Sequence, residues 1–283
     1  MLTKIGQHIS KSYIHRPIFI IGSGRSGTSI LLQALGAHPS ILAFPGESPF
    51  LTSIGGNASL FIGSESDYYQ NAIRLPLPSL ISKLAQLGYE VSGGEFHALK
   101  NTLKHRLQHR QFGNKSIRYW SAKTFPPQQV STGLDKVYPG SKYLYIVRNG
   151  IDVVHSMSKF HGFKENDFET HCKTWAESIS KYDYLRTKPN ALMVRHEQLT
   201  HDPAILFSKI YTFLELIDNS ESLTFTKSNL IHSLDQPDVK IKDSNTQFLK
   251  RGDPSILWDN NQRRIFSDLC KTKMLALGYD CNF

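Results

Sequence analysis

A glycine-rich stretch able to bind a phosphate lies near the start of the chain. Residues 22–29 read GSGRSGTS, one step from the phosphate-binding pattern G-x-x-x-x-G-K-[ST], with Thr28 in place of the lysine. Arg25 supplies a cation instead, and the start of a following helix would add backbone donors. The missing lysine argues against ATP or GTP hydrolysis, in which that lysine contacts the β and γ phosphates. The residues that we expect to bind the anion are Gly24, Arg25, Ser26, Gly27, Thr28 and Ser29.

A second group able to hold a phosphate lies in residues 142–160, KYLYIVRNGIDVVHSMSKF. An apolar run ends at Arg148, and Ser156 lies two turns along the helix that we expect to follow. A guanidinium forms charge-assisted, forked hydrogen bonds with phosphate, and a hydroxyl adds a directional donor. One such junction would be unremarkable, but two junctions with matching patterns in one chain argue against coincidence.

Together the two segments resemble the cofactor-binding segments of sulfotransferases, enzymes that use 3′-phosphoadenosine 5′-phosphosulfate (PAPS) and need no metal. The resemblance implies that the glycine-rich stretch binds the 5′-phosphosulfate, and that Arg148 and Ser156 bind the 3′-phosphate. The product would be 3′-phosphoadenosine 5′-phosphate (PAP).

Further stretches are similar to the family and are closest to its protein-tyrosine branch. They are WSAKTFPP (120–127) with Lys123, VRHEQLTHDP (194–203) with His196, an implied cofactor residue, where tyrosine is usual, DSNTQFLKRGDPSILW (243–258) and MLALGYD (274–280). The third stretch carries further implied cofactor residues, Ser244, Lys250, Arg251 and Gly252.

The resemblance also indicates catalytic residues. Cytosolic sulfotransferases have K-T-H on the strand with the active-site lysine, and the histidine is the base. This chain has K-T-F from Lys123 to Phe125, and phenylalanine cannot accept a proton. Glu47, in FPGESPF, matches the glutamate that acts as base in the protein-tyrosine branch. The implied reaction is an in-line displacement in which Glu47 takes the proton of the acceptor hydroxyl, while Lys123 and Arg25 stabilise charge on the leaving oxygen.

The elements that must position these residues indicate an α/β fold. Helical stretches alternate with apolar runs that predict strands near residues 17–22, 118–122, 142–147 and 191–195. This alternation favours a central, mostly parallel sheet flanked by helices, with both phosphate segments at the carboxyl ends of strands. No linker-like run appears, so we expect one P-loop-like domain over residues 1–283. Residues 50–115 match nothing in the family, and we expect this variable insertion to bind the acceptor.

The charge of the chain limits its partners. A net charge of +9 calls for an anionic partner, and the densest basic run lies between Lys100 and Arg118. A polyanionic cofactor would use that positive field. Nucleic acid would use it too, but no zinc-finger, helix-turn-helix or RNP-like motif accompanies it, so we expect no nucleic-acid partner.

Metal and membrane binding find no support in the sequence. His105 and His109 have helical spacing, but no acidic or sulfur ligands follow nearby, so we expect no metal site. No apolar stretch is long enough to span a membrane, and residues 1–16 do not read as a secretory signal. Three unclustered cysteines suit a reducing compartment, and we expect a cytoplasmic protein.

The acceptor stays open at this point, since peptide tyrosine, a sugar hydroxyl and a small-molecule alcohol or phenol all fit. The protein-tyrosine branch has threonine and arginine after its catalytic glutamate, whereas Ser48 and Pro49 stand here, and the change removes a cation suited to acidic peptides. Two other classes of protein remain alternatives. One is a nucleotide kinase-like P-loop enzyme that requires Mg²⁺, and the other is an inactive protein that binds PAPS or a polyanion.

Overall fold

A computed structural model of the chain describes residues 12–60, 76–94, 117–229 and 254–281. The chain divides into two compact units, of which the first comprises residues 1–19 and 35–142 and the second residues 20–34 and 143–283. The single domain expected over residues 1–283 stays a prediction. Each unit is described separately below, after the sheet.

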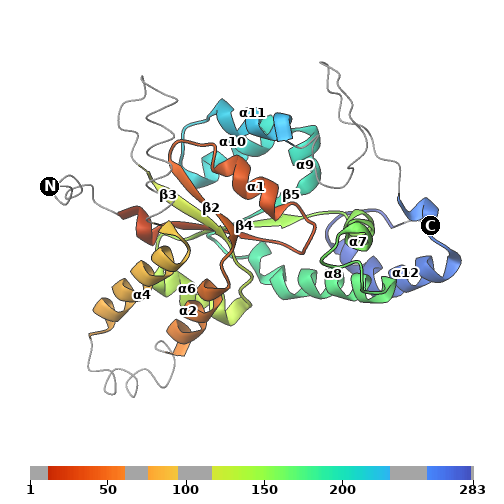
Figure 1. The fold of residues 1–283 in the computed structure, drawn as a ribbon, viewed down its shortest axis with the longest axis horizontal. Coiled ribbons are helices and arrows are strands. Elements are labelled where there is room, and N and C mark those ends of the chain that lie inside the picture. The colour runs from red at the N-terminus through yellow and green to blue at the C-terminus, as the bar shows by residue number, and fades with distance from the viewer. Residues whose placement is uncertain (1–11, 61–75, 95–116, 230–253, 282–283) are drawn as a thin grey trace. The chain divides into compact units, whose positions relative to one another are not determined.

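A five-stranded parallel sheet is the centre of an α/β fold, as predicted (Figure 1). Its strand order is β2-β3-β1-β4-β5, with β1 at Pro17–Ile21, β2 at Ile41–Glu47, β3 at Tyr119–Lys123, β4 at Lys142–Val147 and β5 at Ala191–Arg195. Strands β1, β3, β4 and β5 lie within one residue of their predicted bounds. Strands β1 and β3 are buried along their whole length, as expected of parallel strands covered on both faces.

Strand β2 was not predicted. Its apolar run from Ile41 to Phe44 is followed by Pro45 and Gly46, which usually end a strand. The pairing with β3 accommodates them as an irregularity: Ala43 pairs with Ser121, and the next pair is Glu47 with Lys123. The extra residues on β2 therefore place Glu47 opposite Lys123 at the carboxyl ends of both strands.

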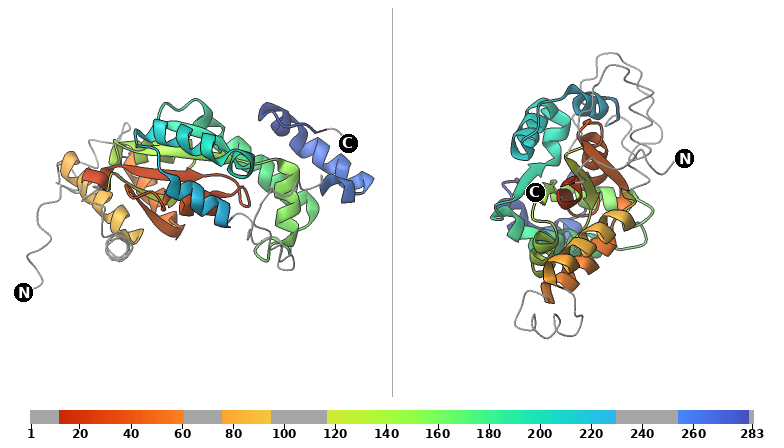
Figure 2. Two further views of the ribbon diagram at one scale, coloured as in Figure 1. Left: turned by 90° about the horizontal axis from the view of Figure 1, so that it is seen from above. Right: turned by 90° about the vertical axis from the view of Figure 1, so that its left-hand side faces the viewer.

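The helices of the first unit are η1 (Ser12–His15), α2 (Pro49–Leu60), α4 (Leu77–Val91) and α6 (Gln128–Val137). In Figure 2, α4 (yellow-orange) lies next to α2 and α6, with which it packs. Helices α2 and α6 approach each other closely at Gly55, where a Cβ would lie only 2.6 Å from the carbonyl oxygen of Val130. The core of this unit is aromatic, with Trp120 stacked on Phe44 at a centroid distance of 5.2 Å.

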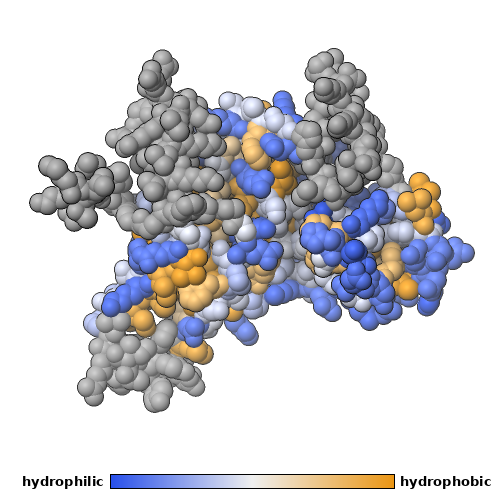
Figure 3. All heavy atoms as spheres, viewed as in Figure 1, coloured by the Kyte–Doolittle hydropathy of each residue, from blue (hydrophilic) through white to orange (hydrophobic). Residues whose placement is uncertain are grey.

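The surface of the first unit carries exposed apolar side chains, visible in orange in Figure 3. Those on α2 and α4 that are more than a third exposed are Phe50, Leu60, Leu87 and Val91. These two helices belong to the segment 50–115 that the sequence marks as a variable insertion. The basic run predicted between Lys100 and Arg118 lies outside the described residues, except for Arg118.

The second unit contains α1 (Thr28–Leu35, except its last residue), α7 (Gly150–Lys159), α8 (Phe168–Tyr182), η2 (Asp183–Arg186), α9 (His196–His201), α10 (Pro203–Leu214), α11 (Ser220–Asn229), η4 (Pro254–Leu257) and α12 (Asn260–Ala276). Helix α8 packs against α7 and α12. Trp175 of α8 stacks on Phe266 of α12, with ring centroids 6.4 Å apart. Across the described segments, no helix combines the length and apolar character needed to span a membrane.

Candidate active site

The predicted anion loop connects β1 to α1, and its glycines occupy positions that other residues would strain. A Cβ on Gly22 would lie 2.6 Å from the carbonyl oxygen of Ile146. Gly27 has a φ of +93°, and a Cβ there would overlap the ring of His196. Arg25 has a φ of 67°, in the left-handed region that non-glycine residues rarely adopt. Such backbone strain is found most often at ligand-binding sites.

Arg25 connects this loop to the second predicted segment. Its Nε donates to Ser156 Oγ at 3.1 Å, and its guanidinium carbon lies 4.1 Å from the centroid of the Phe160 ring. Arg148 Nη1 donates to the carbonyl oxygen of Arg25 at 3.0 Å. The two segments that the sequence assigned to one ligand therefore meet within the second unit, although Arg148 and Arg25 are 123 positions apart in the chain.

The groups gathered here suit a phosphate. Two guanidinium groups and the Ser156 hydroxyl combine charge with directional donors, and both Arg148 and Ser156 are buried. Thr28 and Ser29 begin α1, whose N-terminal N–H groups and dipole favour an anion.

The other predicted loop residues differ in exposure. Gly24 is exposed, and a Cβ there would lie 2.8 Å from the Phe163 ring. Ser26 is 1% exposed, and its hydroxyl bonds with that of Ser23. The Ser26 side chain thus supports the loop from inside in this structure, and its contact with a cofactor stays a prediction.

The predicted base and lysine meet in the first unit. Glu47 and Lys123 end neighbouring parallel strands, with Lys123 Nζ 4.0 Å from Glu47 Oε1. The Glu47 side chain is 63% exposed, while that of Lys123 is only 11% exposed. The Ser48 N–H donates to the Lys123 carbonyl at 2.8 Å and holds the chain after Glu47 against β3. A carboxylate reachable by solvent beside a buried ammonium is suited to proton removal next to developing negative charge.

One carboxylate near the loop was missed by the sequence reasoning. Glu197, the residue after His196, accepts hydrogen bonds from the Asn149 N–H and the Tyr279 hydroxyl, both at 2.9 Å. Burial and the nearby Glu197 carboxylate raise the pKa of the Tyr279 hydroxyl above its ordinary value. The stretches VRHEQL and MLALGYD attracted notice in the sequence, but nothing there showed that they touch.

Four predicted cofactor residues, Ser244, Lys250, Arg251 and Gly252, lie outside the described residues. Within the described part of the chain, no cluster of three or more His, Cys, Asp or Glu side chains could hold a metal ion.

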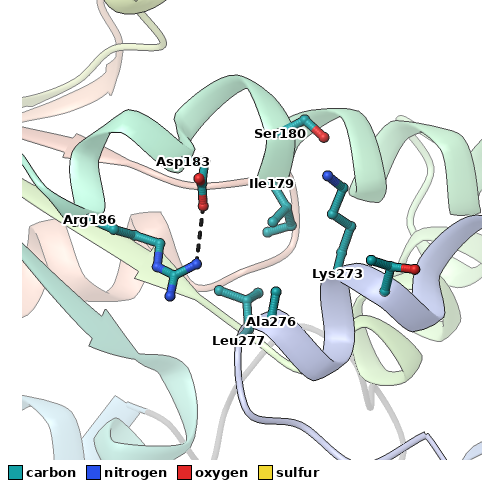
Figure 4. Close-up of a pocket in the computed structure, with 8 residues that line it drawn as sticks. Ile179, Ser180, Asp183, Arg186, Lys273, Ala276 and Leu277 are labelled. Atoms are coloured by element: carbon teal, nitrogen blue, oxygen red, sulfur yellow. Dashed lines mark hydrogen bonds and ion pairs between the residues drawn. The ribbon is translucent and has the colours of Figure 1, made fainter.

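A cavity of about 230 Å³ lies between α8, η2 and α12 (Figure 4). Its lining includes Lys273, Asp183 and Arg186, and the last two are joined by a 3.2 Å hydrogen bond. None of the predicted site residues lines it.

Comparison with known proteins identifies the family of this arrangement. The family model described as "Sulfotransferase family" matches residues 17–220. The chain is similar to the solved structure of mouse sulfotransferase SULT7A1 complexed with PAP, at 17% identity and a TM-score of 0.52, over 92% of this chain and 85% of that one. It is also similar to the sulfotransferase domain from the curacin biosynthetic pathway, at 17% identity and a TM-score of 0.50, over 93% and 97% of the two chains. At these identities the likeness shows the fold alone, and no curated protein matches the chain.

Proposed function

We propose that this chain, which belongs to the sulfotransferase family, transfers a sulfuryl group from PAPS to a hydroxyl group of an acceptor. The observation that carries the proposal is the meeting of Arg25, Arg148 and Ser156 through two hydrogen bonds of 3.1 and 3.0 Å. A P-loop enzyme that hydrolyses ATP or GTP would need a lysine in the loop. It would not need a second phosphate-binding arginine such as Arg148, which is 123 positions from Arg25.

The second unit provides the residues for the cofactor. Arg148 and Ser156 bind the 3′-phosphate, and the N-terminus of α1 with Thr28 and Ser29 binds the 5′ end. Arg25 donates to Ser156, which supports a role for Arg25 in sharing the 3′-phosphate as well as serving as the loop's cation. His196 lies against Gly27 and limits the space around the loop. Ser244, Lys250, Arg251 and Gly252 remain proposed ligands by resemblance.

The first unit provides the proton chemistry. Glu47 accepts the proton of the acceptor hydroxyl, and Lys123 stabilises negative charge that grows on the leaving oxygen. When bound, PAPS supplies the sulfuryl group and a phosphate leaving group. Because Glu47 is mostly exposed, an acceptor can reach it without a rearrangement of β2.

The surroundings of Glu47 favour an acceptor with an apolar or aromatic body. Phe50 lies three residues after Glu47 at the start of α2 and is 39% exposed. Ser48 and Pro49 replace the threonine and arginine of the protein-tyrosine branch, so the cation suited to acidic peptides is missing from this turn. We therefore propose phenols and alkyl alcohols ahead of acidic tyrosine peptides, with glycans between them.

A transfer assay tests the proposal. The protein is incubated with PAPS carrying radiolabelled sulfate and a panel of phenols, alkyl alcohols, glycans and tyrosine peptides. Labelled product from any hydroxyl acceptor supports sulfuryl transfer, and labelled phenols support the proposed class. Calorimetry with PAP and with ATP plus Mg²⁺ covers the other classes: preference for ATP would point to a kinase-like enzyme, and tight PAP binding without transfer to an inactive binding protein.

A further inference from the structure

The carboxylate of Glu197 uses both oxygens on two distant segments of the second unit. Oε1 accepts the backbone N–H of Asn149, and Oε2 accepts the hydroxyl of Tyr279, each at 2.9 Å. Asn149 directly follows Arg148 and is the N-cap of α7. Glu197 therefore contacts the backbone directly after Arg148, the residue that we propose to bind the 3′-phosphate.

Three backbone N–H groups at the start of α7 donate to protein groups. Helices leave their first N–H groups without intrahelical partners, and such groups often bind phosphates. Here the Asn149 N–H donates to Glu197, the Gly150 N–H to Met274 Sδ at 3.2 Å, and the Ile151 N–H to the Asn149 side chain at 2.9 Å. These three donors are already bound within the protein, which leaves Arg148 as the main proposed contact of this junction with a phosphate.

The other end of the Glu197 contact is also fixed. The Arg195 guanidinium lies over the Tyr279 ring, with its carbon 4.7 Å from the centroid, and its Nη2 donates to the Leu277 carbonyl. Gly278 between them has a φ of +72°, which closes the turn after α12. The Tyr279 hydroxyl donates to Glu197, and burial together with the nearby carboxylate raises its pKa above the ordinary value.

We infer that Glu197 is a positioning residue for cofactor recognition: it fixes the junction that carries Arg148 and ties it to the C-terminal turn through Tyr279. The inference rests on the proposed role of Arg148 in reading the 3′-phosphate. The negative charge of Glu197 by itself would weaken PAP binding, because it repels the phosphate, whereas its positioning of Arg148 would strengthen that binding. The two effects differ in sign, so binding measurements separate them.

The test compares two ligands that differ only in the 3′-phosphate, PAP and adenosine 5′-phosphate, by calorimetry on the full chain. Glu197→Ala should weaken PAP binding about tenfold, close to the lower end of what loss of a hydrogen bond involving a charged group costs, and change adenosine 5′-phosphate binding by less than about twofold. Glu197→Gln keeps an acceptor oxygen for the Asn149 N–H and should restore most of the loss. The matched control is Glu177→Gln, which neutralises an exposed carboxylate on α8.

Several outcomes overturn the inference. Tighter PAP binding by Glu197→Ala would show that only its charge matters, and equal losses for both ligands would show a merely structural role. If Glu197→Ala does not fold, Tyr279→Phe decides, since it removes one hydroxyl: a selective loss for PAP supports the inference, and equal or no losses oppose it. Arg148→Ala is measured alongside. If that variant keeps the preference for PAP, the proposed phosphate site fails and the inference with it; if it loses the preference while the Glu197 variants keep it, the inference alone fails.

Discussion

Replacing Glu47 by glutamine separates catalysis from stability in this protein. Glutamine keeps the size of the side chain and removes its basicity, so the proposed general base is lost while the strand end is preserved. We expect sulfuryl transfer to fall by roughly 10² to 10⁴, the usual contribution of general-base catalysis. The PAP dissociation constant should stay within about threefold of wild type, because the proposed 3′-phosphate ligands belong to other segments.

The structure indicates that Glu47→Gln changes the free energy of unfolding only slightly. Glu47 Oε1 and Lys123 Nζ are 4.0 Å apart, and the Glu47 side chain is 63% exposed. Opposite charges at this distance in water attract by about 1 kcal/mol, and exposed ion pairs contribute about 0.2 to 1 kcal/mol. A rate loss of 10² to 10⁴ corresponds to about 2.7 to 5.4 kcal/mol of activation free energy. The catalytic loss therefore exceeds any plausible loss of folding free energy.

The assay measures initial rates with labelled PAPS on the best acceptor of the panel, together with thermal melting and PAP calorimetry. The control is Glu90→Gln, which neutralises an exposed carboxylate on α4 in the same unit. The defect of Glu47→Gln should shrink with acidic acceptors such as nitrophenols, whose hydroxyl needs less help to lose its proton. Near-wild-type turnover on ordinary acceptors would refute the role of Glu47, as would a rate loss matched by an equal loss of stability.

Three further predictions follow from the same geometry. Arg148→Ala should weaken PAP binding by about 1.5 to 3 kcal/mol in calorimetry and leave adenosine 5′-phosphate nearly unaffected, because a charge-assisted bond to the 3′-phosphate is lost; equal losses would contradict its role. Gly46→Ala has open space for its Cβ but must hold a φ of +92°, so it should lower the free energy of unfolding by about 1 kcal/mol. It should also slow transfer, because it disturbs the irregular strand segment before Glu47, the proposed base. The helical Gly56→Ala, which also has room, should do neither in the same melting and rate assays. Lys123→Ala should slow transfer, and the defect should shrink with a donor that has a better leaving group; a constant defect would argue against charge stabilisation.

The sequence predicted the parts of this fold that rest on local pattern. Apolar runs located β1, β4 and β5, the short stretch around Tyr119 and Trp120 located β3, and the glycine spacing located the anion loop. Strand β2 escaped because Pro45 and Gly46 interrupt its run, although the interruption is what brings Glu47 opposite Lys123. The contact of Glu197 with Tyr279 joins residues 82 positions apart, and no local pattern reports a pairing of that range.

The proposed phosphate site also depends on the order in which the chain is made. Arg25 and Ser156 are 131 positions apart, and at 5 to 20 residues per second a ribosome takes roughly 7 to 26 s to synthesise that span. Closing a flexible loop of this length costs about 4 kcal/mol of chain entropy, which contacts in the finished chain must offset. Until Arg148 and Ser156 are synthesised, the glycine loop lacks both of these partners. We therefore expect that the cofactor does not stabilise a chain that ends before them. Cofactor binding can thus stabilise only chains synthesised past this point, and PAP added to a cell-free translation should protect full-length product from proteolysis but not fragments that end before residue 148.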